Sequence, residues 1–191
     1  MKQSQKNQEL KDTIEILAFK GLDFGLAVSL LYNAKIISQD FIDRLEFDQL
    51  VKIYRANIYS GHKIFILDLM EKRASDFWHW KTIFDLTPRD ELTISTCKNR
   101  DEIISKMKKA AMDDFDKLYT LFKLLDVCYY EFRDNIRRVK KEVEDKICRD
   151  IQLTFSQCVQ ILNSAAPNSN LYTKAFQEIS VYILDEFRQK T

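Results

Sequence analysis

The chain is almost free of the residues that interrupt helices. Its 191 residues include three glycines and two prolines, and the 78 residues between Pro88 and Pro167 contain no glycine. Soluble proteins average about 7% glycine and about 5% proline, and these residues are the strongest local terminators of regular structure. The composition therefore predicts an all-α fold, a helical bundle of about five to seven helices. Gly21 and Gly25, four residues apart on the first predicted helix, indicate close helix packing.

The rest of the composition indicates a folded protein without a strong charge preference. Hydrophobic residues make up 46% of the chain, which is enough for a core. Thirty basic residues balance 29 acidic ones and leave a net charge of +1, unlike a general nucleic-acid binder. The polar N-terminus does not resemble a signal peptide, no apolar run reaches 18 residues, and the four cysteines lack metal-ligand spacing. We expect a cytoplasmic protein with reduced thiols, no membrane contact and no bound metal.

Apolar residues at alternating spacings of three and four predict where the helices lie. The expected segments are residues 8–36, 38–60, 62–87, 101–163 and 171–189. As a single helix, 101–163 would be about 95 Å long, which exceeds the size of a compact domain of this length. We therefore expect this amphipathic helix either to break near residue 126 or 146 or to project. The predicted domain organisation is one all-helical domain, 1–191, with a compact bundle at about 8–125 and a long arm with the C-terminal helix at about 126–191.

Each of the two histidines follows an arginine at a short distance. Arg55 and His62 form an R-x6-H element, and Arg73 and His79 form an R-x5-H element. This spacing between two bundle helices resembles the R-x4-6-H motif of the HEPN ribonucleases, a helical family that often cleaves RNA as dimers. The resemblance implies metal-independent cleavage, in which histidine accepts the proton of the 2′-hydroxyl and arginine binds the phosphate.

Of the two elements, the first is better placed for a site. Gly61 puts His62 at an expected helix junction, because glycine usually follows the last residue of a helix. His79 instead lies within a predicted helix between Trp78 and Trp80, where we expect it to pack or to bond locally. The candidate catalytic residues are therefore Arg55 and His62.

The two tryptophans suggest a contact surface. On a helix, Phe77, Trp80 and Phe84 share one face, whereas Trp78 points elsewhere. Trp78 and Trp80 cannot both face the same core, so we expect one of them either at a protein interface or half-buried against a neighbouring helix.

The charged segment 131–150 contains seven basic and six acidic residues, so it is close to neutral. Its narrow apolar stripe predicts a partly exposed helix with a coiled-coil-like seam, covered by a helix from this chain or from another. The stripe consists of Phe132, Ile136, Val139 and Val143.

No specific cofactor motif accompanies these features. The chain has no glycine-rich phosphate loop and no E-x-x-H pair for a di-iron centre, and we expect no cofactor. The sequence favours an interaction protein (an assembly, adaptor or regulatory subunit) whose partner is another protein or a second copy. The alternative is a HEPN-like ribonuclease of a toxin or anti-phage defence system, with RNA as its substrate and Arg55 and His62 as catalytic residues.

Overall fold

The structure of the chain, a computed structural model, is built of helices. It describes residue 12 and residues 23–33, 38–56, 60–87, 94–127 and 133–189. Within these ranges there are ten helices and no strand. The predicted all-α class is confirmed, and the helix count is higher than expected.

The chain divides into two compact units, Met1–Ile103 and Ile104–Thr191. The boundary lies inside helix α7 (Ile94–Ala111). This boundary between compact units lies at another place than the predicted division into a bundle and an arm near residue 125. That division stays a prediction.

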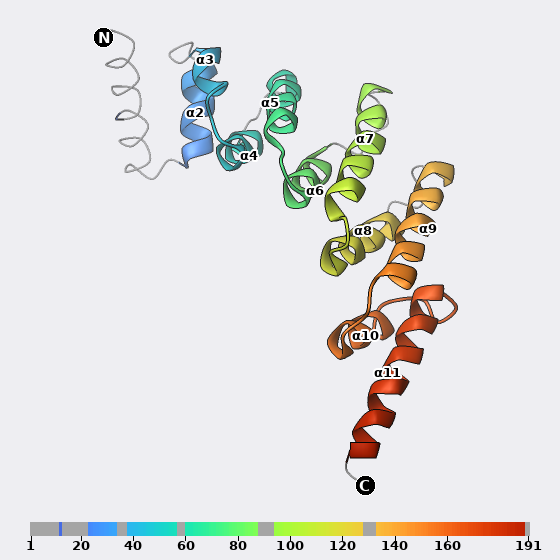
Figure 1. Ribbon diagram of the computed structural model, residues 1–191. Coiled ribbons are helices and arrows are strands. Elements are labelled where there is room, and N and C mark those ends of the chain that lie inside the picture. Colours follow the sequence, from blue (N-terminus) through green and yellow to red (C-terminus); the bar gives the residue numbers. More distant parts are fainter. Residues whose placement is uncertain are drawn as a thin grey trace. The chain divides into compact units, whose positions relative to one another are not determined.

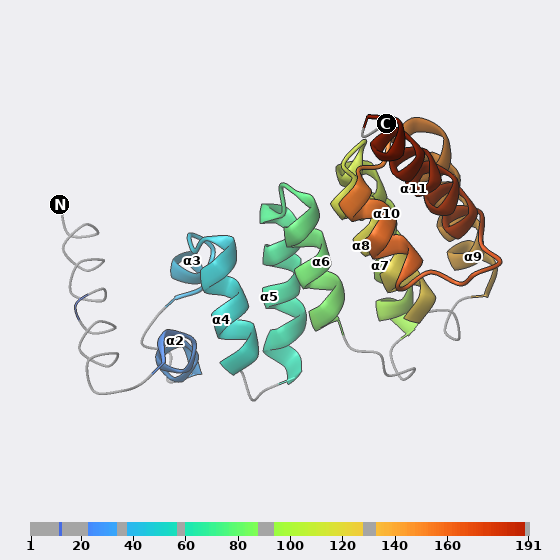
Figure 2. The same cartoon turned by 90° about the horizontal axis from the view of Figure 1, so that it is seen from below.

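In the first unit, successive helices pack side by side. Helix α2 packs on α4, α4 on α5, and α5 on α6 (Figure 2). Leu50, Met70, Phe77 and Phe84 fill the core between them. The helices are α2 (Phe24–Asn33), α3 (Gln39–Ile42), α4 (Phe47–Ala56), α5 (Ser60–Arg73) and α6 (Phe77–Leu86).

Helices α2 and α4 approach so closely that only glycine fits at position 25. A Cβ atom built on Gly25 would lie 2.2 Å from the carbonyl oxygen of Lys52 and 2.5 Å from its carbonyl carbon. Real Cβ atoms do not approach backbone atoms this closely, so any side chain here would force the helices apart. The predicted role in helix packing holds for Gly25, whereas Gly21 lies outside the described residues.

Two of the predicted helices are each interrupted. The segment 38–60 contains α3 and α4, separated by residues 43–46, and the segment 62–87 contains α5 and α6, separated by residues 74–76. Asp76 starts α6 as its N-cap, since its side chain accepts the N–H of His79 at 2.9 Å. The expected helix end near Gly61 is wrong, because α5 begins at Ser60 and includes that glycine.

The second unit begins with the last part of α7, from Ile104, and continues with two helical hairpins. Helix α8 (Phe115–Val127) packs on α9 (Arg133–Asp150), and α10 (Phe155–Leu162) packs on α11 (Asn170–Gln189). The hairpins meet where α11 packs against α9 (Figure 1). Their core includes buried Leu118, Leu121, Ile147, Leu153 and Ile161.

The predicted helix over 101–163 is therefore not continuous. The chain leaves the helical conformation at 112–114 and again at 151–154. Helix α8 ends at Val127, next to the predicted break at 126, whereas α9 runs unbroken through residue 146. Polar residues cause the breaks at 112–114 and 151–154. Asp114 accepts the N–H of Lys117 at the start of α8, and Thr154 forms a capping box with Gln157 at the start of α10. The helix over 171–189 is confirmed as α11.

Helices α4, α6, α8 and α10 begin with one pattern, a repeat that was not predicted from the sequence. Each starts with phenylalanine and has apolar residues three and six positions later. A polar residue precedes each phenylalanine and takes part in a capping hydrogen bond. The four sets are Phe47, Leu50 and Ile53; Phe77, Trp80 and Ile83; Phe115, Leu118 and Leu121; and Phe155, Cys158 and Ile161. In three of the four cases the repeat marks the first helix of a hairpin, namely α4 with α5, α8 with α9, and α10 with α11.

Candidate functional site

The predicted ribonuclease pair lies at the connection between α4 and α5. Arg55 is in the last turn of α4, where its side chain is exposed. His62 is the third residue of α5, but its side chain lies outside the described residues, as do residues 57–59. The pairing of these two side chains stays a prediction.

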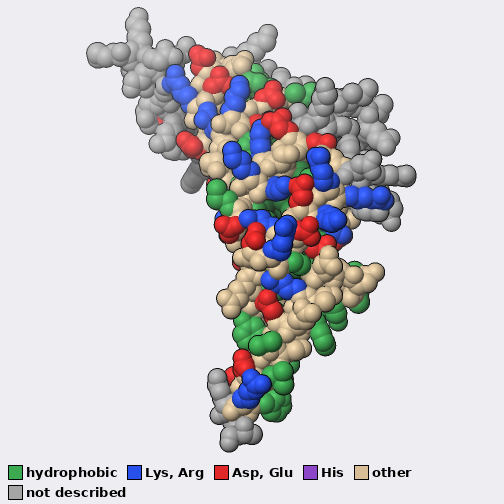
Figure 3. Space-filling model, turned by 45° about the vertical axis from the view of Figure 1, so that its right-hand side comes forward, with side chains coloured by type: hydrophobic (Ala, Val, Ile, Leu, Met, Phe, Trp, Pro, Cys, Tyr) green, Lys and Arg blue, Asp and Glu red, His purple; other side chains and the backbone are tan. Residues whose placement is uncertain are grey.

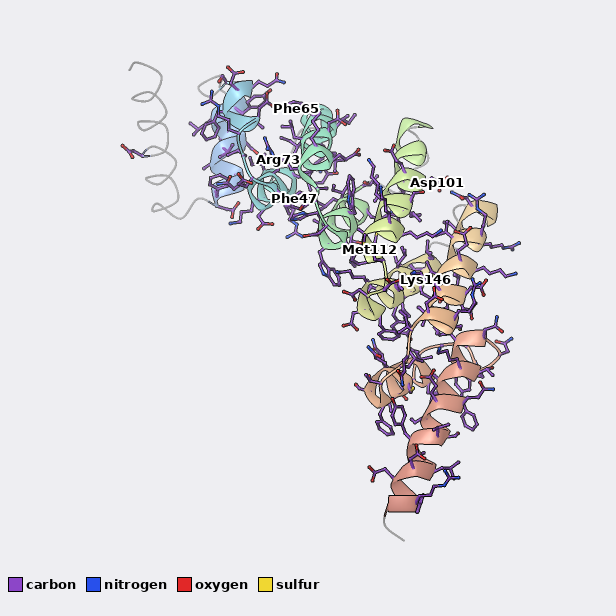
Figure 4. The ribbon with its side chains drawn as sticks, viewed as in Figure 1. Phe47, Phe65, Arg73, Asp101, Met112 and Lys146 are labelled. Carbon is purple, nitrogen blue, oxygen red and sulfur yellow. The ribbon has the colours of Figure 1, made fainter. Side chains whose placement is uncertain are left out.

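Arg73 and His79, the second such pair, make structural contacts instead. Arg73 donates a hydrogen bond to the carbonyl oxygen of Asp43 and so joins the end of α5 to the end of α3. The ring of His79 lies 4.1 Å from that of Phe47, and its Nδ1 accepts the backbone N–H of Ser75 at 3.3 Å. Arg73 and Phe47 are marked on α5 and α4 in Figure 4. These are the local packing and hydrogen bonding expected for His79.

The two tryptophans occupy different environments, as their helical spacing predicts. Phe77 and Phe84 are buried and Trp80 is partly buried, whereas Trp78 is half-exposed at the start of α6. The rings of Trp78 and Phe77 meet edge to face, with their centroids 5.1 Å apart. Trp78 is thus the tryptophan with surface left to contact another molecule.

The apolar stripe on α9 is covered by this chain. Ile136, Val139 and Val143 are buried, and α8 and α11 both pack against α9. Phe132 lies outside the described residues. The seam predicted for this helix is therefore an internal contact at these three positions.

An exposed apolar surface lies instead on α11. Four of its six exposed large hydrophobic residues, at positions i, i+7, i+8 and i+11, share one side of the helix, whereas Val181 and Tyr182 point elsewhere. The exposed fractions of these four range from 46% to 69%. Figure 3 shows hydrophobic side chains gathered around the lower end of the molecule, where α11 lies. We call this surface the α11 stripe, and it consists of Phe176, Ile183, Leu184 and Phe187.

The opposite side of α11 is fixed to α9 and to the segment that precedes α10. Leu171 and Ala175 are buried there. The Nζ of Lys174 donates to the carbonyl oxygen of Cys148 at 2.7 Å, which satisfies a carbonyl in the last turn of α9. Glu178 accepts the N–H of Leu153 at 3.0 Å, and the hydroxyl of Tyr182 donates to the carbonyl oxygen of Leu153 at 2.8 Å. These bonds hold the helix in place and leave the stripe turned outward.

The start of α10 is uncovered as well. The first three repeat phenylalanines, Phe47, Phe77 and Phe115, are buried, whereas 51% of Phe155 is exposed. In the first unit, His79 of the following helix α6 covers Phe47. Phe155 meets an edge of Tyr182 from its own hairpin, with ring centroids 6.2 Å apart. This contact leaves about half of the Phe155 side chain exposed.

Other kinds of chemistry find little support in the residues that the structure describes. These contain no cluster of three metal-binding side chains, and none of their helices is long and apolar enough to cross a membrane. Cys148 and Cys158 are free thiols, and burial raises the pKa of both. A raised thiol pKa lowers the thiolate fraction at neutral pH, which makes both cysteines poor nucleophiles.

Comparison with known proteins adds no relative: no protein-family model matches the chain, and neither a curated protein nor a solved structure matches it significantly. The class is therefore defined by the fold itself, an all-α chain that contains helical hairpins and has an apolar surface on its last described helix.

The α11 stripe was not among the sites predicted from the sequence. Its signal was the spacing of Phe176, Ile183 and Phe187 within the predicted helix 171–189. A second apolar set, Leu171, Ala175 and Tyr182, lies on the other side of the same helix. Spacing alone does not tell which of two apolar faces is covered, so only the fold distinguishes them.

Proposed function

We propose that this protein is an interaction protein, an assembly or adaptor subunit that binds a protein partner through the α11 stripe. The observation that carries the proposal is the exposure, at 46% to 69%, of four large apolar side chains on one side of a single helix. Scattered exposed hydrophobic residues are common, but apolar side chains gathered in one patch mark contact sites.

The repeat supports this proposal. In arrays of helical repeats each hairpin covers its neighbour, and a terminal hairpin that faces water needs a polar outer face. The α11 stripe is apolar instead, and Phe155 beside Tyr182 is half-exposed. The last hairpin is therefore suited to a further helical surface rather than to water.

The rigidity of the surface also favours binding. Lys174, Glu178 and Tyr182 fix α11 through side-chain hydrogen bonds to backbone groups of α9 and of the segment before α10. A preformed surface loses little conformational entropy when it binds. The complementary partner is an amphipathic helix, because such a helix can bury its own apolar face against the stripe.

We place this activity in the cytoplasm. Cys148 and Cys158 are free thiols, which suits a reducing compartment. RNA is a poor fit to the stripe, since its four side chains offer no positive charge for phosphates.

The test is affinity capture with the tagged full chain, followed by reconstitution with the purified captured protein. Ile183→Asp places a charge within the stripe, and Ile64→Asp is the matched control at another exposed isoleucine, on α5. We expect a partner that the wild type and the control retain and that Ile183→Asp binds at least about tenfold more weakly. Equal binding of all three proteins to every captured partner would contradict the proposal.

A further inference from the structure

We infer that the occupant of the α11 stripe is the same stripe of a second copy of this chain, packed antiparallel across a two-fold axis. The inference rests on the proposed function, because it names the partner. It comes from a symmetry in the order of residues along the exposed side of α11.

When α11 is reversed, most of the apolar residues on the side of the stripe come to lie opposite apolar residues. Six positions on this side pair about a centre between residues 181 and 182. Reversing the helix places Phe176 opposite Phe187, Ile179 opposite Leu184, and Ser180 opposite Ile183. A two-fold interface is self-complementary, because each residue must suit the residue that it meets in the reversed copy. The pairs Phe176–Phe187 and Ile179–Leu184 meet this requirement.

Charges do not oppose this arrangement. Successive residues of a helix are turned by about 100°, which places Lys174, Glu178 and Asp185 on the side away from Phe176. Lys174 and Glu178 already bond to each other at 3.2 Å and to backbone groups of the same unit. An antiparallel contact along the stripe therefore brings no like charges together.

The available area is suited to a weak, reversible dimer. A large aromatic side chain buries about 150–250 Å², so the exposed parts of the four stripe residues amount to roughly 450 Å² in each copy. Two copies give about 900 Å² in total, which is the range of weak, transient interfaces. We therefore expect a dissociation constant on the order of micromolar.

The closing experiment measures self-association of the full chain by sedimentation equilibrium over a range of concentrations. The wild type is expected to be a dimer that dissociates on dilution, and Ile64→Asp is expected to behave in the same way. Phe176→Lys and Phe187→Glu, each alone, are expected to raise the dissociation constant at least about tenfold. Circular dichroism and unfolding curves verify that each variant is folded.

The double variant Phe176→Lys/Phe187→Glu tests the register. In the antiparallel dimer each lysine meets a glutamate of the second copy, twice by symmetry, so the double variant recovers much of the lost affinity. A dimer that the double variant does not restore overturns the antiparallel register.

A wild type that stays monomeric at all concentrations overturns the inference altogether. If Ile183→Asp still loses a captured protein in that case, the proposed function stands and its partner is a different protein. If the captured proteins are also unaffected, the proposed function fails together with the inference.

Discussion

The hairpins α8–α9 and α10–α11 share one design but differ in how completely they are covered. Both begin with a capping residue and a phenylalanine, and both place apolar residues three and six positions later. Phe115 is nevertheless buried, whereas Phe155 is half-exposed. The apolar stripe of α9 is likewise buried, and that of α11 is not. The common pattern builds a hairpin, and its burial depends on the neighbour that packs against it.

The contact between α4 and α6 shows what such a neighbour supplies. Phe47 begins α4 and is buried beneath the ring of His79, the third residue of α6. The corresponding third residue of α8 is Lys117 and that of α10 is Gln157. The residue at this position thus differs from helix to helix, and Phe155 is the repeat phenylalanine that is half-exposed.

The largest expected effect separates the covered helix α9 from the uncovered end of α11. Val143→Asp buries an unpaired carboxylate in the core of the second unit and is expected to destabilise it by about 4 kcal/mol or more. Ile183→Asp places the same group on a half-exposed position and is expected to lower the free energy of unfolding of the monomer by about 1 kcal/mol or less. Urea unfolding followed by circular dichroism, at a concentration below that of self-association, measures both. Similar losses would mean that the end of α11 is covered within the monomer.

The repeat phenylalanines give the next largest difference. Phe115→Ala removes a buried ring and is expected to cost about 3–5 kcal/mol. Phe155→Ala removes a ring that is half in water and is expected to cost about 1 kcal/mol or less, largely its edge contact with Tyr182. The same unfolding measurement compares the two. Equal losses of unfolding free energy would show that Phe155 is buried in solution.

These contrasts also show which parts of the fold are readable from the sequence. Scarcity of glycine and proline is a property of the whole chain, so it predicts the all-α class and the helix 171–189. The breaks before α6, α8 and α10 come from Asp76, Asp114 and Thr154, single polar residues whose capping hydrogen bonds leave the apolar spacing intact. The apolar three–four spacing continues across these caps, so the sequence pattern predicts one long helix where the structure has separate helices.

The site is harder to predict than the fold for a related reason. Val143 and Ile183 are both apolar residues on amphipathic helices, and their spacing predicts a covered face in each case. Which face is covered depends on helices that lie far away in the sequence, as α11 does when it covers α9. The stripe on α9 was therefore a reasonable candidate before the fold was known, and the stripe on α11 was not visible as one.

The caps of α8 and α10 are expected to be equivalent although their phenylalanines are not. Asp114→Ala and Thr154→Ala each remove the acceptor for an N–H in the first turn and are expected to cost about 1 kcal/mol. Thr154→Ser keeps the hydroxyl and serves as the control. A much smaller loss for Thr154→Ala would show that α10 is not held as firmly as α8.

The same two caps should respond differently to acid. A hydrogen bond from Lys117 holds the pKa of the Asp114 carboxyl below its usual range. A carboxyl whose pKa is lowered in the folded state adds stability above its unfolded pKa, and that stability is lost as the pH falls through the folded pKa. The difference between wild type and Asp114→Ala is therefore expected to shrink in acid, whereas that for Thr154→Ala persists. Unfolding curves at neutral and acidic pH measure this, and an Asp114 effect independent of pH would contradict it.

The smallest expected effect compares the ends of α7 and α10, the helices that precede the turns at 112–114 and 163–169. Met112 follows α7 with a φ of 45°, a left-handed conformation that costs a non-glycine residue about 1–2 kcal/mol, and its side chain is exposed (Figure 4). Met112→Gly relieves this strain but frees the unfolded chain, so we expect a net gain of about 0.5 kcal/mol. Asn163 ends α10 with a φ of −76°, where glycine gives no relief and is expected to cost about 0.5–1 kcal/mol. Opposite signs for the two substitutions in unfolding curves would show that α7 ends in a left-handed turn and α10 does not, and equal signs would show that Met112 is not strained in solution.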